Sequence, residues 1–205
     1  MKRIDGLCAL LAGALLCAGG LSAQSDNRGF MLNLHLAGNA LTYTGDEAEP
    51  ETGGGLGLAL GYGFNDRIVL YFNLDAAAIE YDEDAGEAPD ETYDAVTGDL
   101  GLRVNFGHEG MKLRPYLNAA LTGVALAEAF ETLPGDEVET ILSGGGLTIG
   151  GGLQYFVSRR LALDVALQAT QGAFTNVRVD DEDEDLETGI AFSASRLQLG
   201  VTWHP

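Results

Sequence analysis

The chain has 205 residues, of which 31 are Asp or Glu and 11 are Lys or Arg, so its formal net charge is −20 at pH 7. Such an excess of negative charge disfavours binding to the phosphate backbone of nucleic acids. The length suits one barrel or sandwich and no linker rich in Pro or Ser divides the sequence, so we expect a single domain.

The N-terminus has the three parts of a secretory signal peptide. A positive start, Met1–Arg3, is followed by an apolar stretch, Leu7–Gly20, and by the small-residue site Leu21–Ala23. We expect cleavage after Ala23 rather than a transmembrane anchor, because the apolar stretch is short and interrupted by glycine. Residues 1–23 are then the signal peptide and residues 24–205 the mature domain. Cleavage removes the only two cysteines, which excludes disulfides and thiolate chemistry from the mature chain.

Apolar residues then alternate with small or polar ones along the rest of the chain, which predicts β-strands. In the predicted hairpin over residues 53–79, Leu and aromatic residues occupy one face and Gly, Ala or Asn the other, with a turn at Asn65-Asp66-Arg67. The predicted strands cover residues 29–37, 53–64, 68–80, 93–106, 113–126, 144–156, 161–171 and 196–203. Between them we expect short turns at one end and, at the other, long acidic loops at 45–51, 82–91, 127–143 and 176–187.

Two barrels fit eight alternating strands. A soluble barrel of the lipocalin kind would turn the Leu face inward and bind a small apolar ligand, but its outer wall would then lack the Lys and Glu that keep a surface solvated. A transmembrane barrel puts the Leu face in lipid and packs the small residues into a narrow lumen. The sequence therefore predicts an all-β fold, an eight-stranded antiparallel up-and-down transmembrane β-barrel.

Aromatic and charged residues support the membrane model. Aromatic residues lie next to the short turns, and Tyr43, Tyr81, Tyr93 and Phe174 lie next to the long loops, as two interfacial girdles would. The segments 45–51, 80–94, 128–139 and 180–187 hold 4, 8, 5 and 7 acidic residues, 24 of the 31. One end of the barrel is expected to be strongly acidic.

The chain resembles the small outer-membrane β-barrel family that includes the barrel domain of outer-membrane protein A. The resemblance covers the mature chain and is carried by Gly150–Asp164, Arg114–Leu117 and the closing Leu197–Trp203. It implies residence in the bacterial outer membrane, contact with outer-membrane lipids, and insertion by the barrel-assembly machinery, which reads a terminal aromatic residue. We also expect a monomer with both termini in the periplasm and the acidic loops outside the cell.

Five charged residues are predicted to point into the lumen. They are Asp75, Asp99, Arg103, Asp164 and Arg196. Buried charges are usually paired, and the interior of an eight-stranded barrel is filled by side chains, so a structural plug is favoured over a narrow channel. A lipid-modifying enzyme is the remaining alternative. His35 is the one candidate base, and no serine or acid stands at a spacing typical of a hydrolase, so we expect no catalysis and no cofactor.

The acidic run near the C-terminus suggests weak divalent-cation binding. Asp181, Asp183 and Asp185 have the spacing with which an EF-hand loop begins, but Leu186 and Phe192 replace the essential Gly and Glu, which excludes an EF-hand. The looser prediction is that these carboxylates collect Mg²⁺ or Ca²⁺, against the simpler view that they are only solvated. The overall prediction is a structural or surface-interaction barrel.

Overall fold

The computed structural model describes residues 27–43, 50–80, 92–107, 110–133, 136–179 and 182–205, without the side chains of 128–139, 182–185 and 187. The predicted signal peptide lies outside these residues. The eight strands are β1 (Gly29–Tyr43), β2 (Glu51–Gly63), β3 (Ile68–Glu80), β4 (Thr92–Asn105), β5 (Leu113–Leu133), β6 (Asp136–Phe156), β7 (Leu161–Val179) and β8 (Glu182–Trp203). No helix in the described part of the chain is long and apolar enough to cross a membrane.

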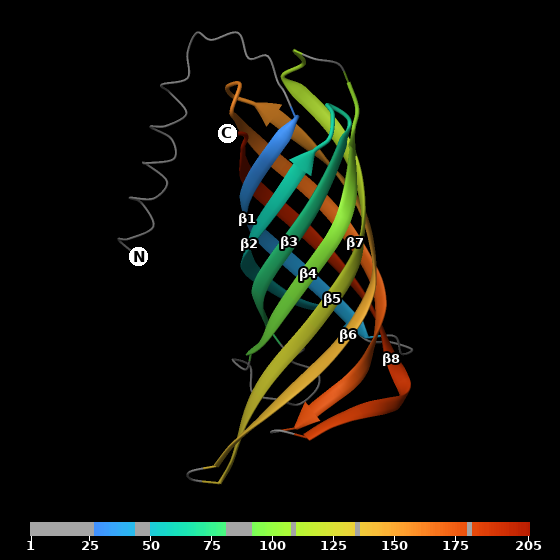
Figure 1. Ribbon diagram of the computed structural model, residues 1–205. Helices are drawn as coiled ribbons and strands as arrows, with labels where there is room; N and C mark the ends of the chain where they lie inside the picture. The colour runs from blue at the N-terminus through green and yellow to red at the C-terminus, as the bar shows by residue number, and fades with distance from the viewer. Residues whose placement is uncertain (1–26, 44–49, 81–91, 108–109, 134–135, 180–181) are drawn as a thin grey trace, which may run out of the picture.

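The strands form a closed barrel in which every neighbouring pair is antiparallel. Consecutive strands are hydrogen-bonded, and β1 pairs with β8 from Leu32–Trp203 to Tyr43–Phe192, which closes the cylinder. Figure 1 shows the strands tilted against the barrel axis, with β5 to β8 reaching well past β1 to β4 at one end. The predicted number of strands, their antiparallel order and the fold class are confirmed.

Leucines cover the outside of the barrel. Leu36, Leu121 and Leu167 are each at least 60% exposed, whereas the alternate positions point inward and are buried. A water-facing wall of this kind would expose far more contiguous apolar surface than soluble proteins carry. The soluble alternative, which needs the leucines inside, is therefore wrong.

The short turns are stabilised by side chains that accept backbone hydrogen bonds. The Oδ1 atom of Asn65 accepts from the backbone N–H of Arg67 and of Ile68, both at 2.9 Å. Ser158 does the same between β6 and β7, where its Oγ accepts from the N–H of Leu161 at 3.1 Å. Such local acceptors replace the strand ladder where the chain reverses. We call this side of the barrel the turn end and the opposite side the loop end.

The loop end differs from the prediction in two ways. The segments 127–143 and 176–187, expected to be loops, are mostly strand, because β5 with β6 and β7 with β8 continue as paired ladders well past the barrel wall. Tyr93 and Phe174, expected in a membrane girdle, point into the lumen, where they are 4% and 0% exposed. Of the other two residues expected in that girdle, Tyr43 is partly buried and packs beside Phe174, and Tyr81 lies outside the described residues. At the turn end, outward-facing Tyr62, Phe106 and Trp203 confirm the girdle. Phe156, which was also expected in that girdle, is completely buried.

Glycine permits two close contacts in the lumen. His35, Gly57 and Asp75 occupy paired positions on β1, β2 and β3, and a Cβ added at Gly57 would lie 2.1 Å from the His35 ring and 2.2 Å from the Asp75 carboxylate. On β6, a Cβ at Gly152 would lie 2.5 Å from the Tyr116 ring. At these two positions, the missing side chain leaves room for large polar side chains to extend into the narrow lumen.

Candidate functional site

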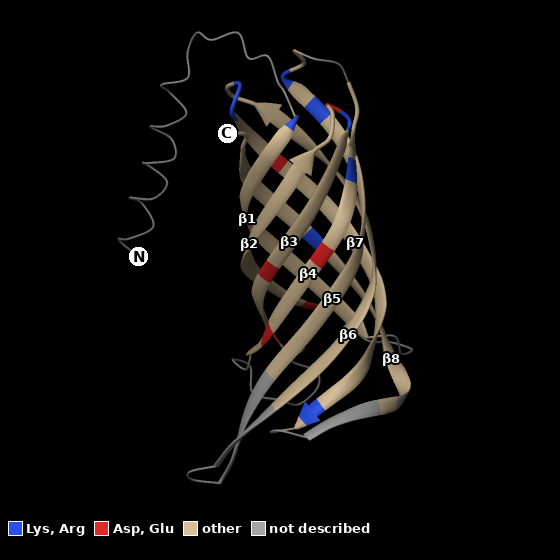
Figure 2. Cartoon of the chain, in the orientation of Figure 1, with Lys and Arg blue, Asp and Glu red and all other residues tan. Residues whose placement is uncertain are grey.

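The lumen is the site in which the predicted charged residues meet. Figure 2 shows Asp and Arg positions within the barrel at about mid-height, separate from the Lys and Arg residues that gather at the turn end. All five predicted lumen residues are buried: Asp75, Asp99, Arg103, Asp164 and Arg196. They fall into two layers along the barrel axis.

The central charge layer consists of Asp75, Asp99 and Arg196. The Arg196 guanidinium contacts both carboxylates at 2.8 Å, through Nη1 to Asp75 Oδ2 and through Nη2 to Asp99 Oδ2. Two further side chains complete the hydrogen bonding of the carboxylates. Thr122 donates to Asp99 Oδ1 at 2.7 Å, and His35 Nε2 lies 2.6 Å from Asp75 Oδ1. A charge-assisted network of this kind joins strands β1, β3, β4, β5 and β8 across the lumen.

The second charge layer, nearer the turn end, pairs Arg103 with Asp164. Arg103 Nη1 lies 3.4 Å from Asp164 Oδ2, and the guanidinium stacks on the Tyr116 ring at 3.5 Å from the ring centroid. Arg103 also donates to Gln154 Oε1 at 2.9 Å, while the Tyr116 hydroxyl donates to Asp164 Oδ1 at 2.6 Å. Both charges are thus hydrogen-bonded as well as paired, which is what burial of charges requires.

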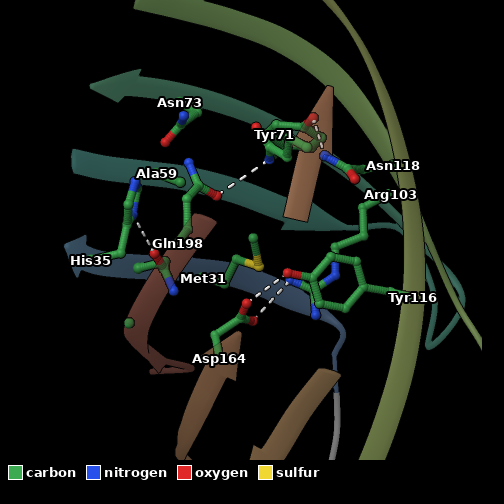
Figure 3. A pocket seen from close by; sticks show the side chains of 13 residues that line it. Met31, His35, Ala59, Tyr71, Asn73, Arg103, Tyr116, Asn118, Asp164 and Gln198 are labelled. Carbon is green, nitrogen blue, oxygen red and sulfur yellow. Dashed lines mark hydrogen bonds and ion pairs between the residues drawn. The ribbon is translucent and has the colours of Figure 1, made fainter. Parts of the chain in front are cut away.

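A cavity of about 40 Å³ lies between the two charge layers. Figure 3 shows His35 and Asn73 on one side of it and Tyr116 and Asp164 on the other. Three buried amide oxygens that line it have no hydrogen-bond donor among the described residues: Asn73 Oδ1, Asn118 Oδ1 and Gln168 Oε1. A cavity of this volume has room for about three water molecules, and such acceptors are the partners that buried water needs.

Apolar side chains fill the lumen at the loop end. This apolar cluster consists of Leu41, Ile79, Tyr93, Ala95, Val124, Leu126, Phe174 and Phe192. Phe174 and Phe192 pack with ring centroids 4.6 Å apart, and Phe174 is completely buried. A second cavity of about 30 Å³ separates the cluster from Arg196. A hydrated ion would have to cross both a dry apolar layer and a paired charge layer to pass through the barrel.

The turn end is closed by His204 and Phe156. Their ring centroids lie 5.5 Å apart, and the Arg114 guanidinium lies over the Phe156 ring at 5.4 Å from its centroid. The His204 backbone N–H donates to Arg160 O at 2.7 Å, whereas neither ring nitrogen has a hydrogen-bond partner in the described part of the chain. Burial, together with the positive charges of Arg103 and Arg114, lowers the pKa of His204 from 6.5 to about 4.

We predict that His204 makes the folded barrel less stable at acid pH. The unfolded chain binds the proton near pH 6.5 and the folded chain only near pH 4, so stability falls as pH is lowered between these values and is unaffected by this residue above them. The loss is at most about 3 kcal/mol. Urea unfolding of the wild type and of His204→Gln should diverge only below about pH 6.5. Parallel pH curves would contradict this assignment.

The candidate base His35 is held by two neighbouring polar side chains. His35, the candidate base, has Nδ1 2.8 Å from Asn33 Oδ1 and Nε2 against Asp75, so both ring nitrogens face groups of the protein itself. The described residues contain no group of three His, Cys, Asp or Glu side chains placed to hold a metal ion. Of the predicted cation ligands, Asp181 lies outside the described residues, and Asp183 and Asp185 are described only as backbone of β8. Cation binding there stays a prediction.

Sequence reasoning missed several lumen residues. It did not assign Arg114, which is 1% exposed. The alternation put Thr122, Thr148 and Thr170 on the inner face, but it did not predict that Thr148 bridges the other two hydroxyls. It also missed the apolar cluster. The alternation did contain this information, because Leu41 lies on the same face of its strand as the inward-pointing His35. Composition alone, however, assigns every leucine to the lipid-facing side.

Comparisons with known proteins agree with this architecture. A family model described as the outer membrane protein beta-barrel domain matches residues 8–204. Among solved structures, Neisserial surface protein A has a TM-score of 0.59 at 19% identity and covers 85% of this chain and 96% of its own. OprG from Pseudomonas aeruginosa has a TM-score of 0.56 at 10% identity, covering 88% and 98%. Ail, the attachment invasion locus protein of Yersinia pestis, has a TM-score of 0.53 at 13% identity, covering 86% and 98%.

A search of curated proteins finds no match. At these sequence identities, the similarity to the solved structures shows a shared fold and does not transfer their functions to this chain. The family match covers nearly the whole chain and identifies the compartment in which such barrels reside.

Proposed function

Because the chain belongs to the outer membrane protein beta-barrel domain family and therefore resides in the bacterial outer membrane, we propose that it is a non-catalytic barrel with a closed lumen. Its role is structural and interactive: the barrel anchors the chain in the membrane, and the acidic loop end meets the surroundings of the cell. The lumen residues hold the barrel together.

The observation that carries this proposal is the filling of the lumen. Arg196 joins Asp75 and Asp99 in one layer, Arg103 and Asp164 form another, and the apolar cluster covers the first. The cavities left between these layers have volumes of about 40 and 30 Å³. Eight-stranded barrels have interiors just wide enough for side chains to fill, so an open aqueous path is not expected.

Charge at the loop end indicates the kind of partner. The four segments 45–51, 80–94, 128–139 and 180–187 contain 24 acidic residues and no Lys or Arg. Ail of Yersinia pestis, a structural neighbour, has been solved with the heparin analogue sucrose octasulfate, a polyanion. The loop end of the present chain would repel such a ligand and attract cationic partners instead.

Single-channel recording tests the closed lumen. We predict that the purified barrel, reconstituted in a planar lipid bilayer in concentrated KCl, gives no long-lived conductance steps, because the central charge layer and the apolar cluster both block the path. A sixteen-stranded porin reconstituted in the same way serves as the positive control. Uniform steps with the wild-type protein would refute the closed lumen and favour the narrow channel.

A further inference from the structure

A cavity of about 250 Å³ opens at the mouth of the barrel, above the apolar cluster. We call it the mouth cavity, and its lining residues come from six strands: Tyr43, Glu51, Tyr93, Leu126, Thr140, Leu142 and Val177. Tyr93 and Leu126 belong to the apolar cluster, and Tyr43 and Leu142 pack against it. The cavity is therefore a largely apolar cup with tyrosine rings in its wall.

One carboxylate gives the cup a polar anchor. Among the described residues that line the cavity, Glu51 is the charged one, and its Oε2 accepts a hydrogen bond from the Tyr93 hydroxyl at 2.6 Å. The buried Tyr93 fixes the position of Glu51 on the cavity wall. An ionised carboxylate accepts hydrogen bonds and donates none, so it suits a ligand that donates. An ammonium group satisfies both this geometry and the charge.

The tyrosines favour the same ligand. A cation that lies over the face of an aromatic ring gains about 0.5–1 kcal/mol at an exposed site. Tyr43 and Tyr93 line the cavity together with Glu51, so the cup combines aromatic rings with a negative charge.

The electrostatic field at the loop end selects against anions. The strongly acidic segments around the mouth carry no Lys or Arg. Their combined potential concentrates cations near the mouth and opposes the approach of fatty-acid carboxylates and lipid phosphates. An apolar ligand that enters the cup is therefore expected to be cationic rather than anionic.

We propose that the mouth cavity binds a small organic ammonium ion, with an aromatic or alkyl body on Leu126, Leu142 and Val177 and its ammonium group on Glu51. The cavity is somewhat smaller than the roughly 300–1,000 Å³ of drug-sized sites, which limits the ligand to about one ring with a short chain. This site is additional to the structural role proposed above and does not require the lumen to be open or closed.

Methyl NMR of the barrel in phosphatidylcholine nanodiscs tests the proposal. The probes are phenethylamine, which is cationic at pH 7, and 2-phenylethanol, which has the same body without the charge. We expect phenethylamine to shift the methyl signals of Leu126, Leu142 and Val177 saturably, with an affinity at least about tenfold above that of the alcohol, equivalent to about 1.4 kcal/mol.

Two matched variants separate the anchor from the general field. Glu51→Gln should abolish the preference for the amine and leave binding of the alcohol unchanged. Glu80→Gln removes the same charge from the loop end, at an exposed position outside the cup, and should keep the preference. The proposal would be overturned if the two probes bound equally, or if both variants lost the preference for the amine to the same extent. It would also be overturned if no methyl signal shifted, because the cup would then be filled by the chain itself.

Discussion

Replacing Arg196 with methionine should lower the free energy of unfolding by about 3–5 kcal/mol, because it leaves two buried carboxylates without their cation. Asp75 and Asp99 are 2% and 0% exposed, and each lies 2.8 Å from the guanidinium. Methionine fills much of the same volume, so the loss is electrostatic rather than a cavity effect. Urea unfolding in lipid vesicles measures the free energy, and loss of the heat-resistant band in electrophoresis gives a second readout.

The triple variant Arg196→Met, Asp75→Asn, Asp99→Asn should recover most of this loss. Neutral amides keep the shape of the carboxylates without their charge. Double-mutant cycles of Arg196 with Asp75 and of Arg196 with Asp99 separate the interaction energy of each pair from the effects of the single substitutions. Arg28→Met is the surface control, since its pair with Asp66 spans 3.4 Å and the Arg28 side chain is 61% exposed, and it should cost less than about 1 kcal/mol. If Arg196→Met were no worse than Arg28→Met, the central charge layer would not hold the barrel together.

Replacing Phe174 with alanine should cost about 3–5 kcal/mol, the range typical of a large cavity in a packed core. Phe174 is completely buried and packs against Phe192 and Tyr43, with ring centroids 4.6 and 6.1 Å away. Phe174→Leu keeps most of the apolar volume and should cost less than about 1.5 kcal/mol.

The same variant distinguishes the two barriers in the lumen. Because the central charge layer lies below the apolar cluster, Phe174→Ala should remain closed in single-channel recordings although it is much less stable. Conductance steps in this variant would mean that the apolar cluster alone closes the barrel.

The barrel itself was predictable because successive side chains of a β-strand point to opposite faces of the sheet. Alternation of leucine with small residues identifies both the strands and the lipid face, and it also placed Asp75, Asp99, Arg103, Asp164 and Arg196 inside. The pairing of particular charges was not predictable. Arg196 meets Asp75 across 121 positions of the sequence, and this contact depends on the tilt of the strands and on the closure of β8 against β1.

The loop end was predicted less well, for two physical reasons. Acidic residues have low strand propensity, yet β7 and β8 remain paired through Asn176–Asp185 because a hairpin ladder outside the membrane needs no apolar face. An aromatic residue near the membrane surface is equally compatible with an outward position in the aromatic girdle and an inward position in the lumen. Phe174 lies in the lumen because its register with Thr170 places it inward, and composition alone does not reveal that register.

The unequal height of the barrel wall has a consequence for contacts between neighbouring molecules. Among the described residues, pairing of β4 with β5 ends at Asp94–Ala127 while β5 continues to Leu133, and pairing of β1 with β8 ends at Tyr43–Phe192 while β8 starts at Glu182. Within the described part of the chain, each long hairpin thus has a backbone edge with no paired strand, and an edge of this kind invites strand addition and aggregation. The sequence of these edges is rich in Asp and Glu. Like charges would repel the same edge of another copy, so the acidic hairpins guard against edge-to-edge stacking in a crowded membrane.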